Sequence, residues 1–302
     1  MDHYWITMST VVMPIIVVCL FGSLVQRWVP IQTESLANVS LYILAPSLVL
    51  GALAGSDKGP TNLWSIVEFT ALQTALCWGV AACTAKLCRF QPEVSSGITL
   101  TTVFGNASNY GLPVLLLAYG TTGLVNGATY VIGQIVLMNC LGLYIASRSK
   151  VRPREALVQI LKTPLIYAVI LGVIVCLFQI AIPKGVMSGL QMLGNSYPAL
   201  VLVILGIQLG RIRWTGIRRK EVWIAVILRQ CVVPILSELC IWMIGIHGIL
   251  ASILLVQSSM PAAVNAIVVA NKYGSDKELI TLTVAITTII SFLSLPLLIS
   301  MT

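Results

Sequence analysis

Two short runs of Asn, Ser, Gly and Pro interrupt apolar stretches of this sequence, and they hold the residues best suited to chemistry. The first run covers 104–114, Phe-Gly-Asn-Ala-Ser-Asn-Tyr-Gly-Leu-Pro-Val. The second covers 257–265, Gln-Ser-Ser-Met-Pro-Ala-Ala-Val-Asn. Their amides and hydroxyls donate and accept hydrogen bonds, but neither run holds a charged side chain. These residue types therefore predict a binding site.

The same residues predict interrupted helices. Pro113 lacks a backbone N–H, and Gly111 tolerates non-helical backbone. Freed backbone groups cost several kcal/mol each in hydrocarbon, so such a run must line a cavity or pack against a matching break. Where a helix restarts, its first N–H groups carry partial positive charge, which suits a carboxylate or another small anion.

The predicted substrate-binding residues all lie within these two runs. They are Asn106, Ser108, Asn109, Gly111, Pro113, Ser258, Ser259, Met260, Pro261 and Asn265. The alternative is that the Asn and Ser side chains only cap the half-helices. Paired interruptions at comparable places in two halves of a chain favour the binding site, since transporters are built in this way.

A second set of polar residues lies inside apolar spans and is predicted to serve coupling or the pocket. These residues are Gln73, Gln230, Arg229, Glu68 and Glu238. A charge at the centre of a transmembrane helix costs about 2.5–3.5 kcal/mol, which makes such groups functional candidates. Both glutamates lie near span ends, where water can reach them. Neither run contains an acidic residue, which favours uniport, exchange or coupling through the proton of the substrate, while hydroxyls and amides leave sodium coupling open.

The elements that position these residues are transmembrane helices. The sequence is 58% hydrophobic and 9% charged, whereas a soluble domain carries about 25% charged residues, so a soluble enzyme is excluded. The apolar stretches lack the alternation of a membrane barrel, which predicts an all-α protein. The predicted spans are 6–26, 36–55, 63–85, 95–119, 124–146, 157–181, 187–209, 222–244, 248–270 and 279–300.

The basic residues predict the orientation in the membrane. With ten spans, all of the 18 Lys and Arg residues except Lys58 and Lys184 fall on or near one face. The positive-inside rule makes that face cytoplasmic and places both termini outside a multi-pass protein of the cell membrane. The net charge of +8 is therefore a topology signal, and a nucleic-acid partner is not expected.

The chain is predicted to contain an inverted repeat, with 1–150 as the first five spans and 151–302 as the second five. A basic loop at 148–154 separates the halves. Because each half has an odd number of spans, the second enters from the opposite side. Three proline pairs mark the register, at offsets of 150, 152 and 148: Pro14 and Pro164, Pro46 and Pro198, and Pro113 and Pro261.

The two runs carry a family resemblance. Asn-Tyr-Gly-Leu-Pro-Val at 109–114, Tyr-Gly at 119–120 and Ser-Met-Pro-Ala-Ala-Val-Asn at 259–265 resemble the auxin efflux carrier family of membrane transporters. The resemblance implies the fold shared with bile-acid transporters and sodium–proton antiporters. In that fold spans four and nine cross at their prolines in a transport domain of spans 3–5 and 8–10, and spans 1, 2, 6 and 7 form a scaffold.

The resemblance also implies a class of substrate. Family members are plant auxin carriers and prokaryotic permeases for malate, malonate and similar organic anions. The loop between the halves is only about ten residues here, so the chain resembles the short prokaryotic members. Carried over, Asn109, Pro113 and Pro261 would contact the substrate at the crossing.

The resulting hypothesis is a secondary active or facilitative transporter of mono- or dicarboxylates, with auxin-like acids included, that works by alternating access. An ion or solute channel is the first alternative and an intramembrane enzyme the second. No Gly-x-Ser-x-Gly, His-Glu-x-x-His or Cys-x-x-Cys motif occurs, so no catalytic residue, metal site or cofactor is predicted. The expected partners are the substrate anion and the lipid bilayer, and a homodimer is left open.

Overall fold

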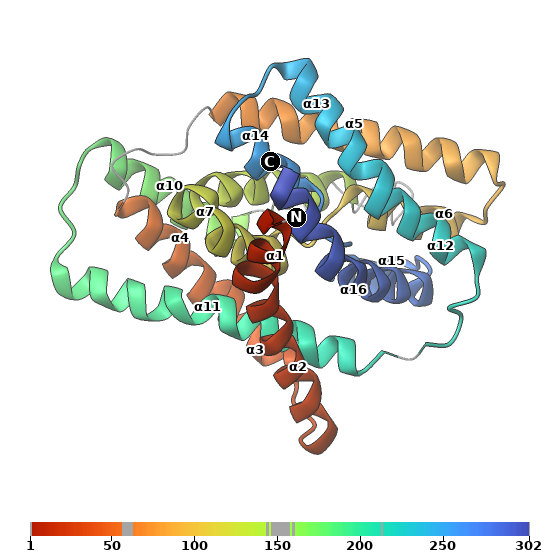
Figure 1. The fold of residues 1–302 in the computed structure, drawn as a ribbon, viewed down its shortest axis with the longest axis horizontal. Helices are drawn as coiled ribbons and strands as arrows, with labels where there is room; N and C mark the ends of the chain where they lie inside the picture. Colours follow the sequence, from red (N-terminus) through yellow and green to blue (C-terminus); the bar gives the residue numbers. More distant parts are fainter. Residues whose placement is uncertain are drawn as a thin grey trace.

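The computed structural model describes residues 2–55, 63–142, 145, 158, 161–212 and 214–301, without the side chains of 2 and 271–273. Lys58 and the predicted basic loop at 148–154 lie outside the described residues. All regular structure in the described ranges is helical, apart from one antiparallel bridge between Gly105 and Ala262. Figure 1 shows the arrangement of these helices.

Seven described helices are long and apolar enough to cross a membrane, which confirms the predicted all-helical, multi-pass class. They are His3–Trp28, Thr33–Ala54, Leu63–Leu87, Ala107–Gly142, Lys184–Gly210, Lys220–Ile244 and Lys277–Met301. Two shorter apolar helices, Pro164–Leu177 and Ile249–Ser258, fall in the predicted sixth and ninth spans. The count of ten spans and their inversion stay a prediction.

The first half of the chain contains the following described elements, where α marks an α-helix and η a π-helix. They are α1 (Asp2–Thr7), η1 (Met8–Val12), α2 (Met13–Trp28), α3 (Thr33–Val39), η2 (Ser40–Leu44), α4 (Ala45–Ala54), α5 (Leu63–Leu87), α6 (Pro92–Val103), η3 (Ala107–Gly111), α7 (Leu112–Leu137) and η4 (Met138–Gly142). Inside α7 the backbone of Gly120 is non-helical, with φ 61° and ψ −148°. This bend falls between the predicted fourth and fifth spans.

The second half of the chain is built in the same way. Its elements are α10 (Pro164–Leu177), α11 (Lys184–Gly210), α12 (Lys220–Ile227), η5 (Leu228–Val232), α13 (Val233–Ile244), α14 (Ile249–Ser258), α15 (Asn265–Tyr273) and α16 (Lys277–Met301). The predicted ninth span is therefore divided into α14 and α15.

Four of the π-helical segments have a common cause in the sequence. A proline follows each segment by two residues, as the second residue of the next α-helix: Pro14 after η1, Pro46 after η2, Pro113 after η3 and Pro234 after η5. Proline cannot donate to the carbonyl four residues earlier, and its ring collides with that carbonyl. A wider turn relieves the collision and keeps the helix continuous.

The helices pack in two sets. In the first set α11 packs along α2 and α4, and α10 packs on α4. In the second set α5 packs against α6, α7 and α13, while α16 packs against α6 and α12. Figure 1 shows α11 with α2 and α4 on one side of the molecule and α5 with α13 on the other. The sets meet where α1 contacts α16 and where α4 contacts α7.

The second set contains two similar series of elements. Leu63 and Lys220 begin the long helices α5 and α12–η5–α13, and these two residues are 157 positions apart. The same distance of 157 separates the ends of these helices at 87 and 244, and the starts of α6 and α14 at 92 and 249. In Figure 1 α13 crosses α5 obliquely and in contact with it, and the chain runs in opposite senses along the two helices.

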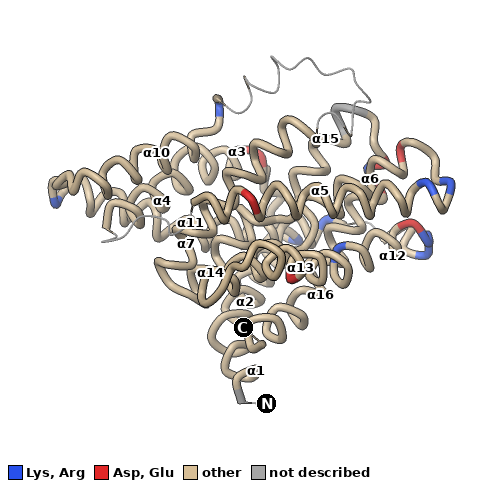
Figure 2. The backbone as a smooth tube through the Cα atoms, turned by 90° about the horizontal axis from the view of Figure 1, so that it is seen from above, with Lys and Arg blue, Asp and Glu red and all other residues tan. Residues whose placement is uncertain are grey.

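Most charged residues lie at the ends of the helices, and Glu68, Arg229 and Glu238 lie within them. Figure 2 shows Lys and Arg residues gathered at the end of the molecule where α5, α6 and α12 have their termini. Along the same view most of the tube between the helix ends is uncharged, although red segments lie on α5 and beside α13. This separation leaves an apolar belt around the bundle, as a bilayer requires.

Candidate functional site

The two interrupted helices meet at a crossing, which we define as residues 104–106 and 259–264. The N–H of Asn106 donates to the carbonyl of Pro261 at 2.7 Å, and the N–H of Ala263 donates to the carbonyl of Phe104 at 3.0 Å. These two bonds flank the bridge between Gly105 and Ala262. Backbone groups freed by one interruption are therefore satisfied by the other, as the low-dielectric interior of a membrane protein requires.

The prediction that spans four and nine cross at both prolines is wrong on one side. Pro261 lies in the crossing, next to Ala262, but Pro113 lies eight residues beyond Gly105, in the first turn of α7. Pro113 relieves its collision through η3, like the other prolines that follow π-helices. Gly105, rather than Pro113, occupies the place that matches the second interruption, and these partners are 157 residues apart.

Arg229 holds the ends of both interrupted helices. Its side chain is 1% exposed and comes from η5. It donates from Nη1 to the carbonyl of Thr102 at 2.9 Å, from Nη2 to Ser258 at 2.8 Å and from Nε to Met260 at 2.7 Å. The first carbonyl belongs to the last turn of α6 and the second to the last residue of α14, where helix dipoles place partial negative charge.

The absence of a side chain at Gly105 makes room for this guanidinium. A Cβ at Gly105 would overlap Nη2 of Arg229. The chain therefore needs glycine here for close approach, since even alanine would displace one arm of the arginine.

A second buried side chain links the two interrupted helices where the chain restarts after the first interruption. Gln257, at the end of α14, donates from Nε2 to the carbonyl of Ala107 at 3.0 Å. Its amide lies against Gly111, where a Cβ would overlap Oε1. Gln257 thus links α14 to the start of η3.

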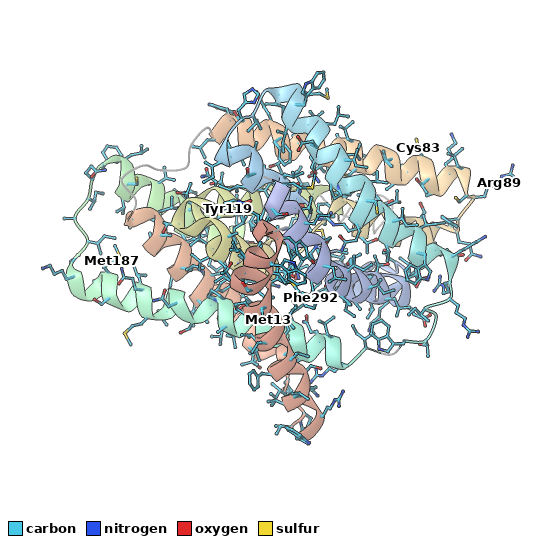
Figure 3. All side chains as sticks on the ribbon, viewed as in Figure 1. Met13, Cys83, Arg89, Tyr119, Met187 and Phe292 are labelled. Carbon is cyan, nitrogen blue, oxygen red and sulfur yellow. The ribbon has the colours of Figure 1, made fainter. Side chains whose placement is uncertain are left out.

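η3, which follows the first interruption, contacts helices of both sets. Tyr197 of α11, which is 1% exposed, donates from its hydroxyl to the carbonyl of Ser108 at 3.1 Å. Tyr110 accepts a hydrogen bond from Ser291 of α16 at 3.1 Å, and its ring packs edge-on to Phe292. Figure 3 shows Phe292 and Met13 where α16 and the N-terminal helix come together, with Tyr119 on α7 nearby.

The structure brings most of the predicted binding residues to the crossing or beside it. Asn106, Ser258, Ser259 and Met260 are buried there, as are Gly111, Pro113 and Pro261. Ser108 and Asn109 are partly exposed at the start of η3. Asn265 begins α15, and its side chain is exposed. Their role in substrate binding stays a prediction.

The predicted coupling residues divide into two groups. Arg229 is central, and Gln230 of η5 donates to the carbonyl of Thr287 on α16. Gln73 is buried and accepts a hydrogen bond from the hydroxyl of Tyr130 at 3.3 Å. Glu68 and Glu238, in contrast, have exposed side chains, and no described hydrogen bond or ion pair brings them to the crossing.

Several buried polar atoms around the crossing have no hydrogen-bond partner among the described residues. They are Oγ1 of Thr102, Nδ2 of Asn106, Oε1 of Gln257 and Oγ of Ser259. An unpaired polar atom costs about 1–3 kcal/mol when it is buried. Such atoms mark places where water or a ligand would gain hydrogen bonds.

Three residues important to the crossing are absent from the predicted site: Gln257, Tyr197 and Thr287. The hydroxyl of Thr287 accepts the N–H of Ala262 at 3.1 Å. A signal for this residue was present in the sequence, because hydroxyl residues recur on one face of 279–300 at 283, 287 and 291, and all three are buried. Polar residues repeated at helical spacing in a transmembrane helix indicate a face turned away from lipid.

A multi-pass helical protein with paired interrupted helices in its interior has the architecture of a membrane transporter. Comparison with known proteins agrees: residues 153–299 match the family model described as membrane transport protein. The chain is 28% identical over 291 residues to an uncharacterized transporter of Methanocaldococcus jannaschii, and the match covers 92% of this chain and 91% of the relative. It is 25% identical over 268 residues to an uncharacterized transporter of Methanothermobacter thermautotrophicus, covering 88% of each chain. The resemblance to the auxin efflux carrier family is thereby confirmed.

Proposed function

We propose that this protein is a secondary active or facilitative transporter that moves small organic anions by alternating access. The observation that supports this most is the crossing, where two interrupted helices exchange backbone hydrogen bonds deep inside the bundle. A channel needs a continuous water-filled path, whereas hydrogen-bonded backbone of the two interrupted helices fills the crossing. A carrier uses such breaks to expose a site to each side in turn.

The inverted arrangement belongs to this proposal. Ten spans, five in each half, would form a scaffold from spans 1, 2, 6 and 7 and a transport domain from spans 3–5 and 8–10. The constant distance of 157 residues between the elements at 63–105 and at 220–262 supports the repeat in the transport domain. Alternating access follows if the two halves exchange their shapes around the crossing.

The restarting helices support an anion as the substrate. The helix formed by η3 and α7 begins at Ala107, and α15 begins at Asn265, so each presents its partial positive end beside the crossing. Nδ2 of Asn106 is a buried donor without a partner at the first of these ends. A mono- or dicarboxylate such as malate or malonate would accept hydrogen bonds from these groups.

The cell membrane, with both termini outside, is the proposed location. Its support is the distribution of Lys and Arg along the sequence, read by the positive-inside rule. A cysteine added at the N-terminus, on a background without the eight native cysteines, would react with an impermeant maleimide on intact cells. Labelling that requires permeabilised cells would reverse the proposed orientation.

Uptake into proteoliposomes tests the function. The purified protein is reconstituted and offered labelled malate, malonate and indole-3-acetate, with pH and sodium gradients imposed separately. We expect saturable uptake of at least one acid, and Asn109→Ala or Asn265→Ala should abolish it while insertion and folding are retained. The exposed Glu34 of α3, which belongs to no predicted site, provides a control, Glu34→Gln, in the same series. Single-channel currents far above carrier turnover would overturn the proposal in favour of a channel.

A further inference from the structure

Arg229 is a fixed positive charge inside the bundle. A residue that binds substrate directly keeps its donors free, whereas Arg229 already donates to backbone carbonyls. Its three contacts are backbone carbonyls: those of Thr102 and Ser258 lie at the ends of α6 and α14, and that of Met260 lies in the second interruption. The ion pairs found in the described part of the chain all belong to Arg219 and none to Arg229. The guanidinium therefore lacks a carboxylate partner there and is 1% exposed.

The partial charges of the helix ends around the crossing determine what electrostatic effect Arg229 has. Each helix end carries about half an elementary charge, positive at the N-terminus and negative at the C-terminus. Two C-termini, those of α6 and α14, and two N-termini, those of η3–α7 and α15, meet at the crossing. Without another charge, their contributions cancel, and the crossing would not distinguish an anion from a neutral molecule.

Arg229 lies against the two C-termini and neutralises them. The positive ends at Ala107 and Asn265 are then left uncompensated, with a total of about one positive charge. We propose that Arg229 determines the charge of the substrate: by cancelling the two negative helix ends, it makes the crossing accept an anion at the two positive ones. This inference rests on the proposed function and names how its site selects among solutes.

Arg229 acts through the helix ends and is a specificity-determining residue that needs no contact with the substrate. Three of its five N–H groups are already committed to carbonyls, and the side chain is enclosed. Lysine would keep the charge but lacks the planar fork that reaches three carbonyls at once. Glutamine would keep hydrogen-bonding capacity and lose the charge. These two substitutions therefore separate charge from geometry.

The test compares acids with their uncharged amides in one preparation of protein. Wild-type, Arg229→Lys and Arg229→Gln proteins are reconstituted, and labelled malonate uptake is inhibited with malonate or malonamide. The same is done for labelled indole-3-acetate with indole-3-acetate or indole-3-acetamide. Because each ratio comes from one sample, it does not depend on how much of a variant is folded. Monodisperse elution in detergent identifies the variants that fold.

We expect the wild type to prefer the acid, Arg229→Gln to lower the acid-to-amide preference about tenfold, and Arg229→Lys to keep it within about threefold, although its rate falls. A folded Arg229→Gln protein with the wild-type preference would overturn the inference. If Arg229→Gln does not fold, Arg229→Lys decides: retained preference supports the role of charge, and lost preference overturns it. A wild type that takes up neither acid would instead defeat the proposed function, and this inference with it.

Discussion

The two interruptions of the crossing serve the same purpose with different residues. The first covers three residues, Phe104–Asn106, and is opened by Gly105. The second covers six residues, Ser259–Val264, contains Pro261 and uses the hydroxyl of Thr287 for one of its N–H groups. Only N–H and C=O groups must match across the crossing, and each half can present them by its own local means.

The largest effect is expected from a substitution that disturbs the first interruption alone. Gly105→Ala would place a Cβ on Nη2 of Arg229, so overpacking and lost hydrogen bonds together should destabilise the protein by about 3 kcal/mol. Ala262 is the partner of Gly105 in the bridge and already carries a Cβ. Ala262→Gly is therefore the matched control and should cost about 1 kcal/mol or less. Thermal unfolding in detergent measures both, and equal losses would contradict the asymmetry.

A smaller loss is expected where α14 meets η3. Gly111→Ala would force the Gln257 amide from its place and cost about 1–3 kcal/mol. Gln257→Ala alone would leave the carbonyl of Ala107 without this donor, at about 1–2 kcal/mol. In the double variant the collision disappears, so its loss should be less than the sum of the single losses. Additive losses in thermal unfolding would show that the two residues do not interact.

The second interruption can be weakened from α16. Thr287→Val removes the hydroxyl that accepts the N–H of Ala262, and a buried N–H without a partner should cost about 1–2 kcal/mol. Thr287→Ser keeps the hydroxyl and should stay close to the wild type. Among the described residues no hydroxyl accepts an N–H of the first interruption, so the difference between the two variants isolates the second. A valine variant as stable as the serine variant would refute this dependence.

The smallest effect is expected outside the crossing, where the loop before α16 meets the start of α6. The N–H of Asp276 donates to the carbonyl of Glu93, and the Asp276 carboxylate accepts a hydrogen bond from Arg219 at 2.6 Å. Burial alone would raise the pKa of Asp276. Hydrogen bonds from Arg219 and the N–H of Leu279, with the charge of Arg219, outweigh burial and lower the pKa below its usual range.

A carboxyl whose pKa is lowered by folding stabilises the protein above its unfolded pKa of about 4, and this contribution is lost as the pH falls through the folded value. Asp276→Asn should therefore cost about 0.5–1 kcal/mol at pH 7, as expected of a partly exposed ion pair. Wild-type and variant melting temperatures should converge as the pH falls below the lowered folded-state pKa of Asp276. A difference that persists there would assign the effect to something other than the charge.

Most of the long helices could be predicted from the sequence because their cause is local. The predicted span 63–85 matches Leu63–Leu87, and 222–244 matches Lys220–Ile244. The interruptions were also predictable, since Gly, Asn and Pro together disfavour a helix in hydrocarbon. The match between Pro113 and Pro261 was misleading because the two prolines have different settings. Pro113 follows a π-helix, whereas Pro261 lies in the crossing.

The contacts that build the site could not be predicted, because their acceptors are backbone carbonyls. Arg229 stood out in the sequence as a charge inside an apolar span, but any residue can supply the carbonyls that Thr102, Ser258 and Met260 provide. The same holds for Gln257 and the carbonyl of Ala107. The pattern of side chains in the sequence therefore does not show which backbone carbonyls will accept these hydrogen bonds.

The exchange of backbone hydrogen bonds across the crossing has a consequence for biogenesis. The carbonyl of Phe104 and the N–H of Asn106 find their partners in Ala263 and Pro261, which the ribosome makes more than 150 residues later. Until then the first half must hold unsatisfied groups in the bilayer, at a cost of several kcal/mol each. The nascent first half is therefore an incomplete product that depends on a late segment, and truncation before 261 should send it to membrane quality control.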